Sequence, residues 1–142
     1  MQVILHIGAH RCATTTFQSY LRGNADRLMA QSQTGFWGPR RTRRGLLNGL
    51  IPAPGPMPRR DMQARAEGRV QMNLAKAAQK GVQHLVVTDE NMMGSMRENL
   101  AMGALYCGVG ERMSRIGQAF GGQITDVLLN IRAQDGYWPS AL

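Results

Sequence analysis

The sequence predicts an α/β fold in which a parallel β-sheet lies between layers of helices. Three short apolar runs, at residues 3–7, 84–88 and 124–131, have the length and the β-branched content of buried strands. Stretches with helical periodicity separate these runs. Parallel strands need long crossover connections, so this alternation favours a parallel sheet with helices on its faces.

The first half of the chain begins with the strand at residues 3–7, which ends at Gly8. A helix is predicted from about Thr14 to about Met29, because apolar side chains at Phe17, Leu21 and Leu28 share one face. A Pro-rich and Arg-rich segment at about 38–62 follows, and we expect it to be an exposed loop.

The second half begins with a helix whose apolar positions are three or four residues apart and which ends near Gly81. After the strand at 84–88, residues 95–119 are predicted to be helical in two pieces, split near Gly108 and Gly110. The strand at 124–131 comes next, with Val127, Leu128 and Leu129 at its centre, and the last residues begin another helix. At 142 residues, the chain fits one domain that needs neither disulfides nor a metal for stability.

The net charge is concentrated in one part of the chain. The formal charge is +8, and residues 40–69 contain eight arginines against Asp61 and Glu67, which accounts for +6. Such a segment can bind an anionic acceptor, such as an acidic carbohydrate, or a nucleic acid without sequence specificity. Because the rest of the chain is nearly neutral, we expect no specific nucleic-acid partner.

The cysteines and the apolar segments indicate the compartment. The chain has two cysteines, Cys12 and Cys107, without the spacing of a zinc site, which is typical of a reduced cytoplasmic protein. The N-terminal residues lack the pattern of a secretory leader, and no run of about 18 apolar residues occurs. We therefore expect no metal and no membrane association.

Residues 8–16, which follow the first strand, have the features of an anion-binding loop. In parallel sheets, ligands bind at the carboxyl ends of the strands. Here small residues allow close approach of the backbone, a helix begins, and Arg11 with Thr14, Thr15 and Thr16 can donate charged or hydroxyl hydrogen bonds. A Walker loop would need Gly and Lys where the chain has Ala13 and Thr14, which argues against a nucleotide triphosphatase.

Residues 6–18 read HIGAHRCATTTFQ, and this run resembles the phosphosulfate loop H-I-G-x-H-K-T-G-T-T-x-L-Q of sulfotransferases that use 3′-phosphoadenosine-5′-phosphosulfate. Arg11 stands in place of the family Lys and Ala13 in place of the family Gly. The resemblance implies a P-loop-like three-layer fold. It also implies that the sulfophosphate of this donor is bound by Arg11, Cys12, Ala13, Thr14, Thr15 and Thr16.

A second motif agrees with the resemblance. In the family, an Arg at a strand end and a Ser eight residues later hold the 3′-phosphate of the donor, and here these residues are Arg132 and Ser140. The family fold continues beyond these elements, so the resemblance implies that residues 1–142 form its cofactor-binding part and that the later segments are absent.

Two carboxylates are candidates for the catalytic base. Sulfuryl transfer to a hydroxyl or amine needs a group that takes the acceptor's proton. Thr88 ends the second strand, and Asp89 and Glu90 follow at the position where the family places its base. We expect Glu90 or Asp89 to fill this role, with Glu90 favoured.

Two other functions remain open from the sequence. The chain can be a noncatalytic protein that binds an anion or nucleotide in the loop and a polyanion on the basic segment. A P-loop-like kinase is the weaker alternative, because no Lys stands at position 14.

Overall fold

The structure is a computed structural model that describes residues 1–50 and 60–141. Within these residues, four parallel strands form one sheet with the order β2-β3-β1-β4. The strands are β1 (Gln2–His6), β2 (Thr34–Trp37), β3 (His84–Thr88) and β4 (Ile124–Leu128). The predicted α/β class with a parallel sheet is confirmed.

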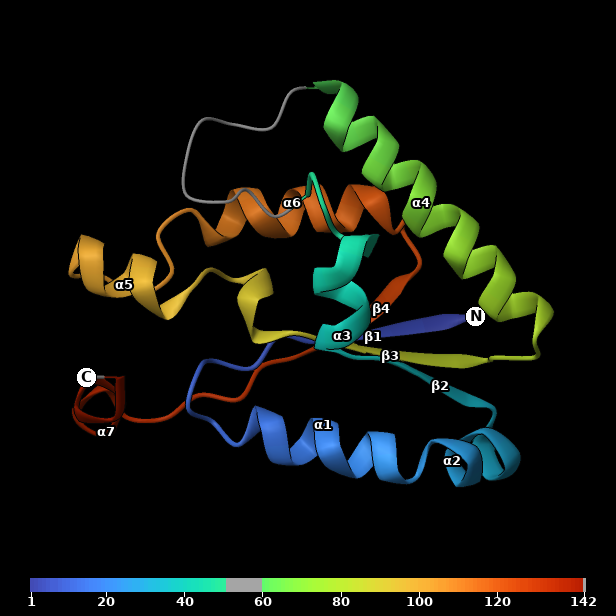
Figure 1. The fold of residues 1–142 in the computed structure, drawn as a ribbon, viewed down its shortest axis with the longest axis horizontal. Coiled ribbons are helices and arrows are strands. Elements are labelled where there is room, and N and C mark those ends of the chain that lie inside the picture. The colour runs from blue at the N-terminus through green and yellow to red at the C-terminus, as the bar shows by residue number, and fades with distance from the viewer. Residues whose placement is uncertain (51–59, 142) are drawn as a thin grey trace.

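Helices cover both faces of the sheet (Figure 1). The helices are α1 (Thr14–Gly23), α2 (Ala25–Ser32), α3 (Pro39–Arg41), α4 (Arg60–Gln79), α5 (Met96–Met102), α6 (Val109–Ala119) and α7 (Gln134–Ala141), with short turns η1 (Thr42–Leu46) and η2 (Glu90–Met92). Helices α1 and α2 lie on one face, and α4 and α6 lie on the other. Helices α5 and α7 lie beyond the carboxyl ends of the strands.

The apolar core lies between the sheet and the α4–α6 layer. Alternate residues of β1 and β3 point to this side, because side chains alternate between the faces of a strand. The core residues include Val3, Leu5, Leu85 and Val87 from the strands and Val70, Leu74, Ile116 and Phe120 from the helices, all of them at most 2% exposed. This layer therefore supplies most of the apolar burial that stabilises the fold.

Two elements differ from the sequence-based expectation in the first half of the chain. The helix predicted from about Thr14 to about Met29 is two helices, because Asn24 interrupts it: the Asn24 side chain and backbone N–H both donate to the Tyr20 carbonyl. Strand β2 was not predicted. It has four residues, one of them Gly35, and this is too short for a clear periodic signal.

The expectation of an exposed loop at 38–62 is wrong for the described residues of that segment. Residues 39–46 form α3 and η1, and Leu46, Leu47 and Leu50 are buried in the core. Arginines precede these leucines, so the composition of the segment is typical of an exposed loop, although the leucines are buried in the core. Residues 51–59 of the predicted loop lie outside the described residues.

The second half of the chain follows the expected order. Residues 95–119 form the two predicted helices, α5 and α6, separated by residues 103–108. Strand β4 ends at Leu128 rather than at 131. It lies at an edge of the described sheet, and Val127, Leu128 and Leu129 are 54%, 47% and 52% exposed. No described helix combines the length and the apolar character needed to cross a membrane.

Candidate functional site

Three strand ends meet because β1 lies between β3 and β4. His6, the last residue of β1, pairs with Thr88 on one side and Leu128 on the other. The Ala9 N–H donates to the Asn130 carbonyl at 2.8 Å, which extends the contact past the end of both strands. The three segments predicted to carry the chemistry are therefore neighbours at one edge of the sheet.

The loop after β1 has a tightly folded backbone. Arg11 and Ala13 are left-handed, with φ of 63° and 58°. A Cβ on Gly8 would lie 3.2 Å from the His6 Nε2 and 3.3 Å from the Thr14 Oγ1, so this position has little room for a side chain. Cys12 between them is not left-handed, and backbones in which left-handed residues alternate with other conformations can form concave nests of N–H groups that suit an anion.

The N-terminus of α1 adds donors to this loop. Ala13 is the N-cap residue, and no side chain caps the helix. Thr14, Thr15 and Thr16 therefore do not serve as the helix cap, and the amides of the first turn are available to a ligand. This arrangement agrees with anion binding better than with an ordinary capped turn.

One pocket joins the loop to the acidic strand end. A cavity of about 320 Å³, which we call the loop pocket, is lined by His10, Arg11, Ala13, Thr14, Thr15, Glu90 and Met96. Arg11 and Glu90 come from different strand ends, yet they border the same space. The predicted cationic residue and the favoured candidate base therefore lie together.

A second cavity lies on the other side of the loop. This rear pocket, of about 440 Å³, is lined by His6, Cys12, Ala13, Thr16, Phe17, Leu128, Leu129 and Asn130. Cys12 and Thr16 thus border the rear pocket and not the loop pocket. The loop residues predicted to bind one group are divided between two adjoining spaces.

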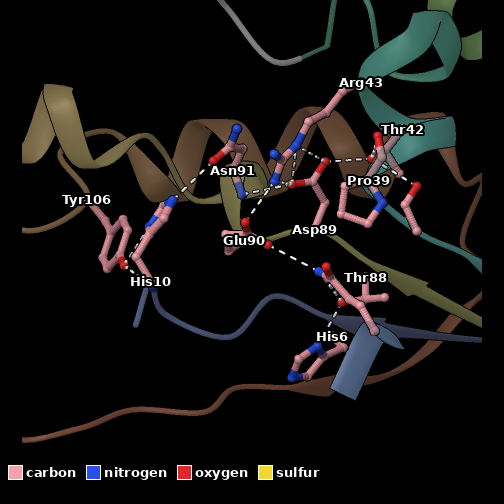
Figure 2. A network of polar contacts seen from close by, with 12 residues as sticks. His6, His10, Pro39, Thr42, Arg43, Thr88, Asp89, Glu90, Asn91 and Tyr106 are labelled. Carbon is pink, nitrogen blue, oxygen red and sulfur yellow. Dashed lines mark hydrogen bonds and ion pairs between the residues drawn. The ribbon is translucent and has the colours of Figure 1, made fainter. Parts of the chain in front are cut away.

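Asp89 is fully buried and surrounded by donors (Figure 2). The Thr42 hydroxyl donates to it at 2.5 Å, the Arg43 Nη2 donates at 2.7 Å, and the Asn91 N–H donates at 3.0 Å. The Arg43 Nε adds contacts to both carboxylate oxygens, at 3.1 and 3.2 Å. Asp89 therefore fixes the segment from Thr42 to Arg43 onto the end of β3, and its oxygens do not face the loop pocket.

One side-chain donor contacts each oxygen of Glu90 (Figure 2). The Arg43 Nη2 donates to Oε1 at 2.8 Å, and the Gln18 Nε2 donates to Oε2 at 3.1 Å. Burial by itself would raise the pKa of Glu90, but hydrogen bonds from its own backbone, from Arg43 and from Gln18, together with the Arg43 charge, lower it below the ordinary value. The carboxylate is therefore ionised at neutral pH.

A buried polar chain runs beneath the loop. Gln18 also donates to the Thr88 Oγ1 at 3.3 Å, and that hydroxyl lies 2.9 Å from the His6 Nδ1. If the Thr88 hydroxyl donates to Nδ1, the proton of the neutral imidazole is on Nε2. Burial lowers the pKa of His6, although the Glu90 charge partly opposes this, so the ring is neutral. The His6 Nε2 and the Thr14 Oγ1 are buried without a protein partner.

His10 lines the loop pocket and is fixed at both ring nitrogens (Figure 2). Its Nε2 lies 3.0 Å from the Asn91 Oδ1, and its Nδ1 lies 3.1 Å from the Tyr106 hydroxyl, which also accepts from the His10 N–H at 2.9 Å. Burial raises the pKa of Tyr106 to about 12, so the phenol keeps its proton. The His10 ring therefore forms a rigid wall of the pocket.

The predicted pair Arg132 and Ser140 is only partly described. The Arg132 Nη1 donates to the Arg11 carbonyl at 3.1 Å, so this arginine reaches the anion-binding loop. Ser140 lies within α7, but its side chain is outside the described part of the structure. The contact of Arg132 with the loop was not predicted from the sequence, and the pairing of Arg132 with Ser140 stays a prediction.

Several residues of the site were missed by sequence reasoning. Arg43 was assigned to an exposed loop, and Gln18 was quoted only as the end of the motif at 6–18. His10 and Tyr106 lie 96 residues apart, and nothing in the local sequence pairs them. Among residues 1–50 and 60–141, no group of three or more His, Cys, Asp or Glu side chains is placed to bind a metal ion.

Comparison with family models, with curated proteins and with solved structures finds no match for this chain.

Proposed function

We propose that this chain is a sulfotransferase-like protein, which binds 3′-phosphoadenosine-5′-phosphosulfate and transfers its sulfuryl group to a hydroxyl or amino group. The observation that carries the proposal is the loop pocket, which is lined by Arg11, by the N-terminus of α1 and by Glu90. A cation with amides on one side and a carboxylate on the other suits transfer of an anionic group to a neutral acceptor.

The donor would be held mainly by the loop. Arg11 and the first amides of α1 would bind its sulfophosphate, because both present N–H groups to an anion. Arg132, which already contacts the Arg11 carbonyl, would bind the 3′-phosphate, with Ser140 implied by the resemblance. The rear pocket, which has apolar walls at Phe17 and Leu128, offers room for the nucleoside. The donor would supply the sulfuryl group, and the bisphosphate would be its leaving group.

Glu90 would take the acceptor's proton. As the acceptor oxygen or nitrogen forms a bond to sulfur and the bond between sulfur and the phosphate oxygen breaks, the proton would pass to a Glu90 oxygen. Each carboxylate oxygen can accept two hydrogen bonds, so Arg43 and Gln18 leave acceptor capacity on both. Asp89 is less suited to this step, because it is fully buried and four donor groups hold it in place.

The acceptor class is proposed from charge. Arg40 and Arg44 are exposed, and they lie on the same segment as Arg43, which contacts Glu90. An anionic acceptor, for example an acidic carbohydrate, would be attracted to this side of the loop pocket.

A noncatalytic anion-binding protein is the second candidate. It is favoured by one observation: both Glu90 oxygens are already hydrogen-bonded, and the lowered pKa makes the carboxylate a weaker base. The anion-binding loop would serve equally well in such a protein. Both candidates predict that the loop binds the donor, but only the sulfotransferase predicts transfer of the sulfuryl group.

Calorimetric titration tests the proposal. The protein is titrated with 3′-phosphoadenosine-5′-phosphate and, separately, with ATP and magnesium, and the Arg132→Ala variant is compared with Arg22→Ala. Arg22 is exposed in the last turn of α1, at the end of that helix opposite the loop. We expect binding of the bisphosphate to weaken at least tenfold in Arg132→Ala, as loss of a charge-assisted bond predicts (about 1.4 kcal/mol), and to stay unchanged in Arg22→Ala.

Preference for ATP, or equal loss in both variants, would reject the sulfotransferase assignment. Binding of the bisphosphate without transfer from the labelled donor to a panel of hydroxyl and amine acceptors would favour the noncatalytic candidate.

A further inference from the structure

Arg43 occupies a position between the basic segment and the reaction centre. Its Nε and Nη2 contact Asp89, and the same Nη2 reaches the Glu90 Oε1 at 2.8 Å. It therefore touches both acidic residues at the end of β3, although it lies 46 and 47 residues away from them in the chain.

The backbone around Arg43 is held in place. Thr42, the preceding residue, is 1% exposed and donates to Asp89, while Leu46, Leu47 and Leu50 are buried in the core. The segment cannot move away from the end of β3 without exposing these leucines and breaking the contacts of a buried carboxylate, both of which cost free energy. Arg43 is therefore presented to Glu90 by a packed element.

The two oxygens of Glu90 have donors from opposite sides. Arg43 approaches from η1 and Gln18 approaches from α1, the helix that carries the anion-binding loop. A carboxylate with one donor on each oxygen has a fixed rotation about its last side-chain bond. In this rotation, Glu90 lines the loop pocket.

We propose that Arg43 is the positioning residue for Glu90, holding its carboxylate ionised and turned toward the loop pocket, so that the basic segment is part of the reaction centre. The inference rests on the proposed function only in calling Glu90 a base. The position and ionisation of the carboxylate do not depend on which donor or acceptor the pocket takes.

The charges around Glu90 agree with this role. The other charged or titratable groups near it are Asp89 beside it, His6 beneath it, and His10 and Arg11, which line the same pocket. His6 is neutral, because burial lowers its pKa. Arg43 contributes both a hydrogen bond and a positive charge to the lowering of the Glu90 pKa.

The test measures the titration of Glu90 in the absence of any ligand. The chain has four glutamates, so the side-chain carboxyl signal of Glu90 can be assigned in ¹³C-labelled protein by its loss in Glu90→Gln. We expect the Glu90 pKa to lie below the ordinary glutamate value in the natural protein. It should rise in Arg43→Gln and return most of the way in Arg43→Lys, which keeps the charge but not the planar fork.

Arg44→Gln is the matched control. It removes one positive charge from the adjacent, exposed residue, whose side chain has no recorded partner in the described structure. We expect its effect on the Glu90 titration to be small, because an exposed charge is screened by solvent and salt.

Several outcomes would overturn the proposal. An ordinary or raised Glu90 pKa in the natural protein would overturn it. This measurement needs no variant, so the test still applies if Arg43→Gln fails to fold. Equal shifts in Arg43→Gln and Arg44→Gln would show a general charge effect. If Arg43 had only a structural role, Arg43→Gln would lower the melting temperature and leave the Glu90 titration unchanged.

If transfer activity is found, a second readout becomes available. Glu90→Gln should lower kcat about 100-fold, as loss of a general base predicts. Arg43→Gln should lower kcat roughly tenfold with little change in the KM for the donor, and the acidic limb of its pH profile should move to higher pH. An unchanged pH profile in Arg43→Gln would contradict the positioning role. Failure to bind the bisphosphate would reject the proposed function and leave the titration result intact.

Discussion

The two faces of the sheet have different side chains and different tasks. Toward α4 and α6, β1 and β3 present Val3, Leu5, Leu85 and Val87, all of them at most 2% exposed. Toward α1, the same strands present His6 and Thr88, which hydrogen-bond to each other and to Gln18. One face is an apolar core, and the other contains a buried polar chain that leads to Glu90.

This difference places apolar packing on one face of the sheet and the candidate site on the other. The hydrophobic effect is non-directional, so apolar side chains stabilise the fold wherever they are buried, including far from the site. A hydrogen-bonded chain has fixed partners and transmits the position of one group to another. Because Gln18 lies on the helix that begins at the anion-binding loop, the polar face connects the loop with the candidate base. The following predictions compare the two faces.

The largest effect is expected on the apolar face. Phe120 is fully buried against the α4–α6 side of the sheet. Phe120→Ala should lower the free energy of unfolding by about 3–5 kcal/mol, because it removes apolar contact and leaves a cavity. Chemical denaturation measures this value. A loss below about 1 kcal/mol would show that this layer is loosely packed.

A reciprocal exchange on β3 compares the faces directly. Val87 and Thr88 are adjacent, fully buried and nearly equal in shape, but they point to opposite faces. Thr88→Val should cost about 1–3 kcal/mol, since His6 and Gln18 each lose a buried partner. Val87→Thr should cost a similar amount, because its hydroxyl would be buried among apolar groups.

The exchange also has a functional readout. Only Thr88→Val should change the Glu90 titration, since Gln18 contacts both Thr88 and Glu90. If both variants shift the Glu90 pKa equally, or neither does, the polar face does not act as a connected chain.

The smallest effect is expected in the loop itself. Ala13 has a left-handed backbone, with φ of 58°, at the position where the sulfotransferase motif has Gly. Ala13→Gly should raise the free energy of unfolding by roughly 0.5–1 kcal/mol, because glycine adopts this conformation without a Cβ clash. Ala9→Gly, whose backbone φ is not positive, is the control and should not stabilise the protein.

Local patterns predicted the elements that carry long or regular signals. The strand at 84–88, the two helical pieces within 95–119 and the helix that ends before Gly81 were predicted from periodicity and glycines. Strand β2 and the break at Asn24 were missed, because a four-residue strand and a single polar residue give weak signals.

Sequence reasoning selected several residues of the candidate site but missed the contacts that connect them. Arg11, Thr14, Thr15 and Glu90 were candidates from the sequence, and they border one pocket. Arg43 was read as part of a loop because arginines and prolines dominate its surroundings. The leucines that follow it pack in the core, and this packing brings Arg43 into contact with Asp89 and Glu90.

The sequence by itself determined the alternation of strands and helices, the run of small residues and threonines at 8–16 and the presence of carboxylates after β3. These features depend on residues within one or two turns of each other, so local periodicity and composition reveal them. The tertiary structure alone decided that β1 lies between β3 and β4, that Asp89 binds the basic segment, and that Glu90 faces the pocket. These depend on contacts between residues 46 to 122 positions apart, such as Arg43 with Asp89 and His6 with Leu128, which form only when the chain packs.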